Sequence, residues 1–121
     1  MTYDVIALLR GTPDTSAILA AILDAGEDLQ LDTIEGAGII AVHDPDGQPL
    51  AAIEAPVLIQ VDGEAERLLG PIAAHLRPPL WWLEIHALER SGAGTVARTI
   101  AASLTARLEG IVWHPDEVST R

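Results

Sequence analysis

One short apolar segment of the chain carries the side chains best suited to chemistry. Trp82, Glu84 and His86 follow one another at intervals of two residues within this segment. Because alternate side chains of a β-strand point to the same face, a strand here would place an indole, a carboxylate and an imidazole in a row. Such a row could bind a basic or planar ligand, and Glu84 with His86 could act as a general acid/base pair.

The residues between these three define the opposite face of the same strand. Trp81, Leu83 and Ile85 are apolar, so we expect them to pack beneath helices and to leave the polar row on the other face. An error of one residue in register would exchange the two faces. The row could equally be the solvent face of a sheet or the seam of a homodimer.

The sequence offers few other groups with a clear chemical role. It contains no cysteine, so these residues can form neither a disulfide nor a thiolate metal site. None of its serines lies in the G-x-S-x-G pattern of a nucleophile elbow. Four histidines, His43, His75, His86 and His114, are spread over different segments without a metal-binding spacing. We therefore predict no catalytic nucleophile, no metal site and no cofactor.

The charge of the chain is strongly one-sided. Its 121 residues include 18 Asp and Glu against 7 Arg and Lys, which gives a formal net charge of −11. A negative field repels phosphate backbones and anionic membranes, so we expect neither a nucleic-acid nor a membrane partner. The same field attracts basic proteins.

No signal for export is visible in the sequence. Residues 1–4 contain no basic region, and no apolar run approaches the length of a membrane helix. We therefore expect a cytoplasmic protein.

The apolar pattern predicts the elements that would position the polar row. Residues 5–9 form an apolar run typical of a strand at the centre of a sheet. Helical periodicity predicts a helix over residues 14–25, with Asp14 as its N-cap, and a longer helix over residues 95–108 that ends at Gly110. Further short strands are predicted over residues 29–34, 39–42, 50–54, 57–61, 80–87 and 111–113.

This order of elements predicts an α+β fold in two layers. We expect an antiparallel or mixed sheet with two to three helices packed on one face, in a ferredoxin-like or related arrangement. The length fits a single domain, which we place at residues 1–115, followed by a frayed C-terminal tail at residues 116–121.

Three functions of different classes fit these features. The first is a small acidic interaction protein, of an inhibitor or immunity type, that binds a basic protein partner and could form a homodimer. The second is a small-molecule sensor or carrier with a pocket near Trp82, Glu84 and His86, and the third is a small enzyme that uses Glu84 and His86 as acid and base. We favour the first, non-enzymatic role, because the charge is acidic and tryptophan is enriched at the centres of protein interfaces.

Overall fold

A computed structural model describes residues 2–34 and 38–114 of the chain. In chain order the elements are β1 (Thr2–Leu9), α1 (Thr15–Ala25), β2 (Gln30–Ile34), β3 (Ile39–His43), β4 (Pro49–Ile53), β5 (Val57–Ile59), α2 (Glu64–Leu69), the 3₁₀ turn η1 (Pro71–Ala73), β6 (Leu80–Leu88), α3 (Ala93–Leu108) and β7 (Gly110–Trp113). The frayed tail predicted at residues 116–121 lies outside the described residues. Within the described part, no helix has both the length and the apolar character needed to cross a bilayer.

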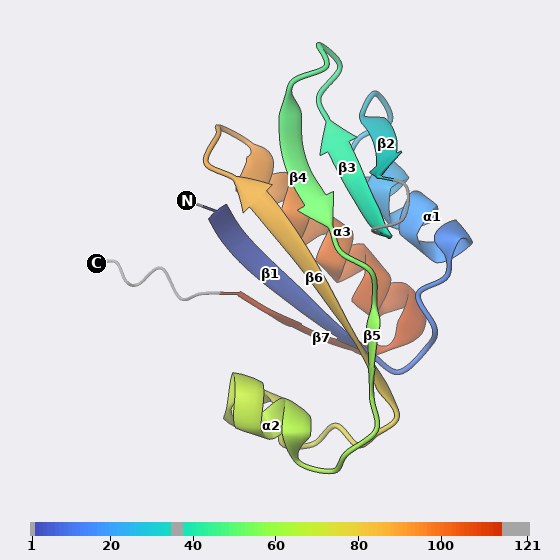
Figure 1. Cartoon of the computed structure of the whole chain (residues 1–121), viewed down its shortest axis with the longest axis vertical. Coiled ribbons are helices and arrows are strands. Elements are labelled where there is room, and N and C mark those ends of the chain that lie inside the picture. The colour runs from blue at the N-terminus through green and yellow to red at the C-terminus, as the bar shows by residue number, and fades with distance from the viewer. Residues whose placement is uncertain (1, 35–37, 115–121) are drawn as a thin grey trace.

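The seven strands form one antiparallel sheet, in which six follow the order β2-β3-β4-β6-β1-β7 and the seventh, β5, pairs with β6 outside this order (Figure 1). Strand β6 lies at its centre, with β1 along one edge. The other edge of β6 is shared, because β4 pairs with residues 85–87 and β5 pairs with residues 80–82. The expected antiparallel α+β fold is thereby confirmed, whereas the narrower ferredoxin-like arrangement is not.

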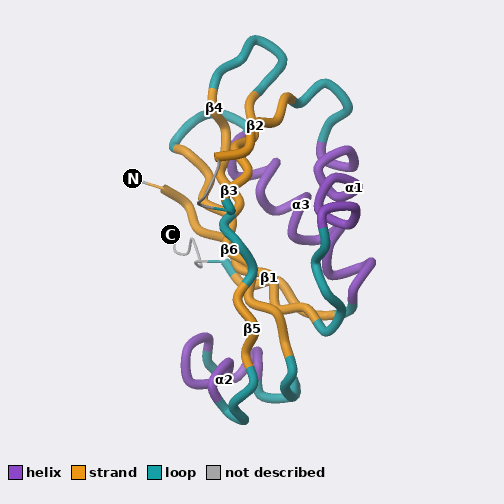
Figure 2. The backbone as a smooth tube through the Cα atoms, turned by 45° about the vertical axis from the view of Figure 1, so that its right-hand side comes forward, coloured by secondary structure: helices purple, strands orange, loops and turns teal. Residues whose placement is uncertain are grey.

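The two long helices pack together on one face of this sheet (Figure 1 and Figure 2). Asp14 caps α1 as predicted, since its Oδ1 accepts a hydrogen bond of 2.9 Å from the backbone N–H of Ala17. On α3, the apolar stripe turns inward, and Ile100 and Leu104 are completely buried. Full burial of such a side chain contributes about 1.5–3 kcal/mol, so this layer supplies the main core.

The short helix α2 lies at the opposite face of the sheet (Figure 2). It covers a second, smaller apolar cluster whose buried members are Leu8, Ile59, Ala65, Ala73 and Leu80. Its companion η1 closes the same cluster. Among the residues that the structure describes, α2 and η1 therefore cover one end of the face turned away from α1 and α3.

One boundary differs from the sequence-based expectation. Gly110 does not end α3 as a glycine cap but begins β7. The cap is Glu109, which takes a positive φ of 63°. Gly110 is required instead by a close approach between strands, because a Cβ atom at this position would overlap the carbonyl oxygen of Leu8.

Candidate functional site

Strand β6 presents two chemically different faces, as its alternation predicts. Leu83 and Ile85 are completely buried in the main core beneath the long helices. Trp82, Glu84 and His86 lie on the other face and are each partly buried. The polar row is thus on the face of the sheet opposite α1 and α3, beside the cluster that α2 covers.

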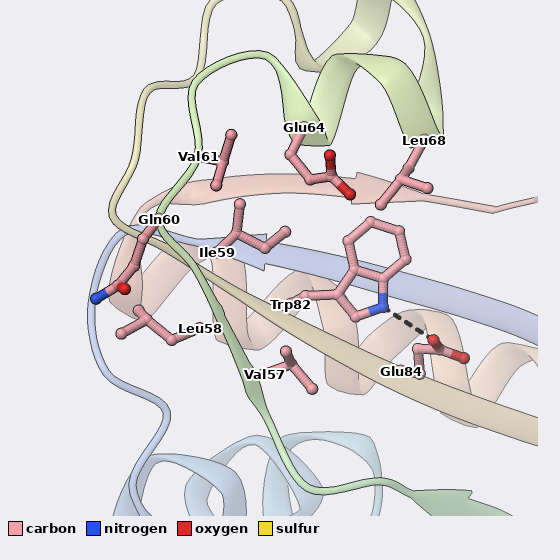
Figure 3. Close-up of a pocket in the computed structure, with 9 residues that line it drawn as sticks. All are labelled: Val57, Leu58, Ile59, Gln60, Val61, Glu64, Leu68, Trp82 and Glu84. Atoms are coloured by element: carbon pink, nitrogen blue, oxygen red, sulfur yellow. Dashed lines mark hydrogen bonds between the residues drawn. The ribbon is translucent and has the colours of Figure 1, made fainter.

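An apolar groove of about 570 Å³ runs past the indole of Trp82 (Figure 3). The residues lining it are Val57, Leu58, Ile59, Gln60, Val61, Glu64, Leu68, Trp82 and Glu84. Several of its apolar walls face solvent, with exposed fractions of 58% for Val57, 65% for Val61 and 48% for Leu68. The groove therefore leaves apolar surface uncovered at the edge of a charged site.

Two carboxylates belong to the groove, and they differ in their partners. Glu64 forms a close ion pair of 2.6 Å with Arg67 on the same helix, and the hydrogen bond from Arg67 lowers the pKa of this carboxyl group. Glu84 instead accepts a hydrogen bond of 2.9 Å from Nε1 of Trp82 through its Oε1. This bond fixes the Glu84 carboxylate beside the indole at one end of the groove (Figure 3).

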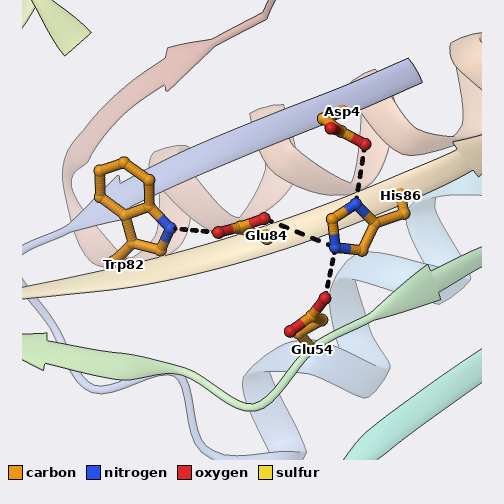
Figure 4. A network of polar contacts seen from close by, with 5 residues as sticks. All are labelled: Asp4, Glu54, Trp82, Glu84 and His86. Carbon is orange, nitrogen blue, oxygen red and sulfur yellow. Dashed lines mark hydrogen bonds and ion pairs between the residues drawn. The ribbon is translucent and has the colours of Figure 1, made fainter. Parts of the chain in front are cut away.

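The row continues from Glu84 into a denser polar cluster around His86 (Figure 4). Oε2 of Glu84 lies 3.5 Å from Nε2 of His86. Oδ1 of Asp4 lies 2.7 Å from Nδ1 of the same ring, and Oε2 of Glu54 lies 2.5 Å from its Nε2. Three carboxylates from three segments of the chain thus surround one imidazole.

The pKa of His86 reflects two opposing influences. Partial burial lowers it, because the ring loses water that would stabilise its charged form. The hydrogen bonds and negative charges of Asp4 and Glu54 raise it by more, so that the net pKa lies above the ordinary value of 6.5. The cluster therefore favours the protonated ring.

Asp4 and Glu54 are the two members of the cluster that sequence reasoning missed. Asp4 stands directly opposite His86 in the pairing of β1 with β6. Glu54 follows β4, and its backbone N–H donates to the carbonyl oxygen of Glu84. The available signal was that Asp4 immediately precedes the predicted strand at residues 5–9 and that Glu54 is the last residue of the predicted strand at residues 50–54. Only the register between strands brings the two acids to His86.

The described part of the chain contains one converging set of three possible metal ligands, which are Glu54, Glu84 and His86. Their donor atoms all lie within 4.8 Å of one another. The other three histidines do not join this set. Comparisons with family models, curated proteins and solved structures find no match to this chain.

Proposed function

We propose that the protein is a binding module that docks a basic, apolar segment of a partner protein in the groove beside Trp82. In this proposal apolar side chains of the partner fill the groove, and an Arg or Lys of the same segment meets the carboxylate of Glu84. The observation that carries the proposal is the fixed position of this carboxylate, which the Trp82 N–H holds at the end of an apolar groove. An inhibitor or immunity-type protein would use such a site.

The exposed walls of the groove support an apolar contact. Val57, Val61 and Leu68 expose about half or more of their surface, and apolar surface that gathers around a hollow is typical of an interaction site. Trp82 is already held by its bond to Glu84, so docking costs it little conformational entropy. We therefore expect Trp82 to supply most of the binding energy.

Electrostatics supports a basic partner. The net charge of −11 draws cations toward the chain. At the groove itself, Glu64 is offset by Arg67. The ion pairs that arginines form in the described residues go to Glu64, Asp44 and Asp24, and none of them goes to Glu84. The positive group nearest to Glu84 is His86, which lies 3.5 Å away and is shared with Glu54. A guanidinium or ammonium group of a partner would add a positive charge on the groove side of this carboxylate.

The two alternative functions receive less support from the same geometry. Small-molecule sites enclose most of their ligand, whereas the walls of this groove stay open to solvent. A general base must be deprotonated before it acts, whereas the hydrogen bonds to Asp4 and Glu54 raise the pKa of His86 and favour its protonated ring. A homodimeric state and a cytoplasmic location stay predictions from the sequence.

Selection of short random peptides displayed on phage would test the docking proposal. The wild-type protein is the target, in buffer containing EDTA, and the Trp82→Leu variant removes peptides that bind elsewhere. We expect enrichment of peptides that combine Arg or Lys with neighbouring apolar residues. A parallel selection with Trp113→Leu, which makes the same change on β7 at a tryptophan that does not line the groove, should recover the same peptides. Failure to enrich any such sequence, or enrichment of acidic ones, would contradict the proposal.

A further inference from the structure

We propose that Glu54, Glu84 and His86 form a binding site for a divalent transition-metal cation, for which Zn²⁺ is the best fit. The site would take one nitrogen and two oxygen ligands from the end of β4 and from β6. This inference goes beyond the docking groove and does not depend on it. The two sites share Glu84, so a metal ion and a partner's basic group would compete for this carboxylate, and each site is tested without the other's ligand. It rests on the spacing of the donor atoms, on what orients them, and on the local charge.

The spacing of the donor atoms is close to that of a coordinated ion. Zinc–ligand distances near 2.0–2.2 Å place neighbouring ligand atoms of a tetrahedral site about 3.3–3.6 Å apart. Oε2 of Glu84 and Nε2 of His86 are separated by 3.5 Å and need no adjustment. Oε2 of Glu54 lies 2.5 Å from the same nitrogen, so it must move by about 1 Å to admit the ion. The Glu54 side chain is 51% exposed and has room to make that movement.

Two groups outside the ligand set orient its members. Asp4 accepts from Nδ1 of His86 at 2.7 Å, which turns Nε2 toward Glu54 and Glu84 (Figure 4). A carboxylate bonded to the far nitrogen is the usual support of a metal-binding histidine, because it fixes the tautomer and raises the basicity of the ligand nitrogen. Trp82 acts in the same way on Glu84, since it binds Oε1 and leaves Oε2 facing His86.

The charge of the cluster also calls for a cation. A protonated His86 offsets only one of the two carboxylate charges of Glu54 and Glu84. A divalent ion bound to the neutral ring offsets both of them. In the described part of the chain, arginines form ion pairs with Glu64, Asp44 and Asp24. None of these ion pairs involves Glu54 or Glu84.

The donor set selects the kind of ion. Mg²⁺ and Ca²⁺ prefer oxygen ligands throughout, whereas an imidazole with carboxylates suits Zn²⁺ and its neighbours in the first transition row. The side chains of Glu84 and His86 are 35% and 23% exposed. Water can therefore reach the remaining coordination position.

Isothermal titration of Zn²⁺ into tag-free, EDTA-stripped protein tests the proposal without any peptide. We expect a single saturable site on the wild-type chain and no comparable binding of Mg²⁺. His86→Gln and Glu54→Gln should each weaken Zn²⁺ binding at least about tenfold, and Asp4→Asn, which weakens the support of the histidine, by about tenfold. The control His75→Gln removes an exposed histidine of the loop after η1 and should leave the affinity unchanged.

Ring ¹⁵N chemical shifts of the wild-type protein provide a readout that needs no variant. Zn²⁺ should shift Nε2 of His86 strongly while Nδ1 keeps the signature of a protonated nitrogen. Absence of binding to the wild-type protein, binding that survives His86→Gln, or shifts confined to the other histidines would each overturn the proposal. Because no peptide is present, a negative result leaves the docking groove unaffected, and failure of the peptide selection leaves this site unaffected.

Discussion

At the scale of single residues, His86 links three segments of the chain on the face of the sheet opposite α1 and α3. Its ring contacts Asp4 of β1, Glu54 after β4 and Glu84 of its own strand. A charged ring held this way joins β1, β4 and β6 by charge-assisted hydrogen bonds, which are stronger than neutral ones. The stability of the metal-free protein should therefore depend on whether His86 carries its proton.

The sign of this dependence follows from the direction of the pKa shift. The pKa of His86 is raised in the folded state above its ordinary value of 6.5. The stabilising contribution of the ring is then fully present below the unfolded pKa and is lost as the pH rises through the folded pKa. The carboxylates that face the ring are those of Asp4, Glu54 and Glu84.

Urea unfolding of the wild-type protein and of His86→Gln, both in EDTA, measures this contribution. We expect the difference in unfolding free energy between them to favour the wild type most near about pH 6 and to shrink toward about pH 9. His75→Gln, at an exposed position, should show no such trend. A wild-type advantage that grows with pH would show that the pKa of His86 is lowered rather than raised.

Residue patterns predicted one part of the site and could not predict the other. The shared face of Trp82, Glu84 and His86 follows from the period of two in a strand, which is a local property. The contributions of Asp4 and Glu54 depend on how β1 and β4 align with β6, and a single sequence carries no direct record of that register. The sequence therefore predicted that Trp82, Glu84 and His86 share one face, but it did not predict that Asp4 and Glu54 lie beside His86.

At the scale of elements, the helices were the most predictable parts of the chain. The stripe on α3 and the cap at Asp14 are strong local signals, and both helices lie within two residues of their predicted bounds. The position of α2 was not predictable in the same way. A helix of six residues has too short an apolar pattern to indicate which face of the sheet it covers.

A glycine at the junction between α3 and β7 allows a test of the close contact between β7 and β1. Gly110→Ala should destabilise the protein by about 1–3 kcal/mol or more, because the new Cβ would force β7 away from the backbone of Leu8. Gly94→Ala makes the same chemical change in the first turns of α3, where the added Cβ meets only ordinary contacts, 3.4 Å to Arg98 and 3.6 Å to Tyr3.

The Gly94→Ala variant should therefore be more stable than the wild type, by about 0.5–1 kcal/mol, because alanine has the higher helix propensity. Chemical denaturation of both variants measures the two effects. Equal stability of Gly110→Ala and the wild type would mean that β7 does not approach β1 as closely as described.

At the scale of the whole molecule, the fold separates its structural and its binding surfaces. One face of the sheet is covered by α1 and α3 and contains the main core. The other face is covered by α2 at one end, and in the described part of the chain the groove and the polar cluster around His86 lie beside α2 on this face. The α+β class could be predicted because helix and strand periods alternate along the chain. The strand order could not, since it depends on contacts between distant segments.

The net charge acts on the same scale and would draw any basic protein toward the chain. A specific site must therefore be distinguished from general attraction. Glu84 at the groove and Glu27, an exposed residue of the turn after α1, carry the same charge. Replacing either with glutamine changes the net charge equally, so the two variants separate a local contact from the overall field.

The most direct measurement is a double-mutant cycle between Glu84 and the basic residue of a selected peptide, by fluorescence anisotropy in EDTA. Replacing the peptide's Arg with Gln should weaken binding to the wild type by about tenfold, or about 1.4 kcal/mol, and should weaken binding to Glu84→Gln far less. The Glu27→Gln control should behave as the wild type does. An equal loss in the wild type and in Glu84→Gln would contradict the proposal that this carboxylate receives the basic group of the partner.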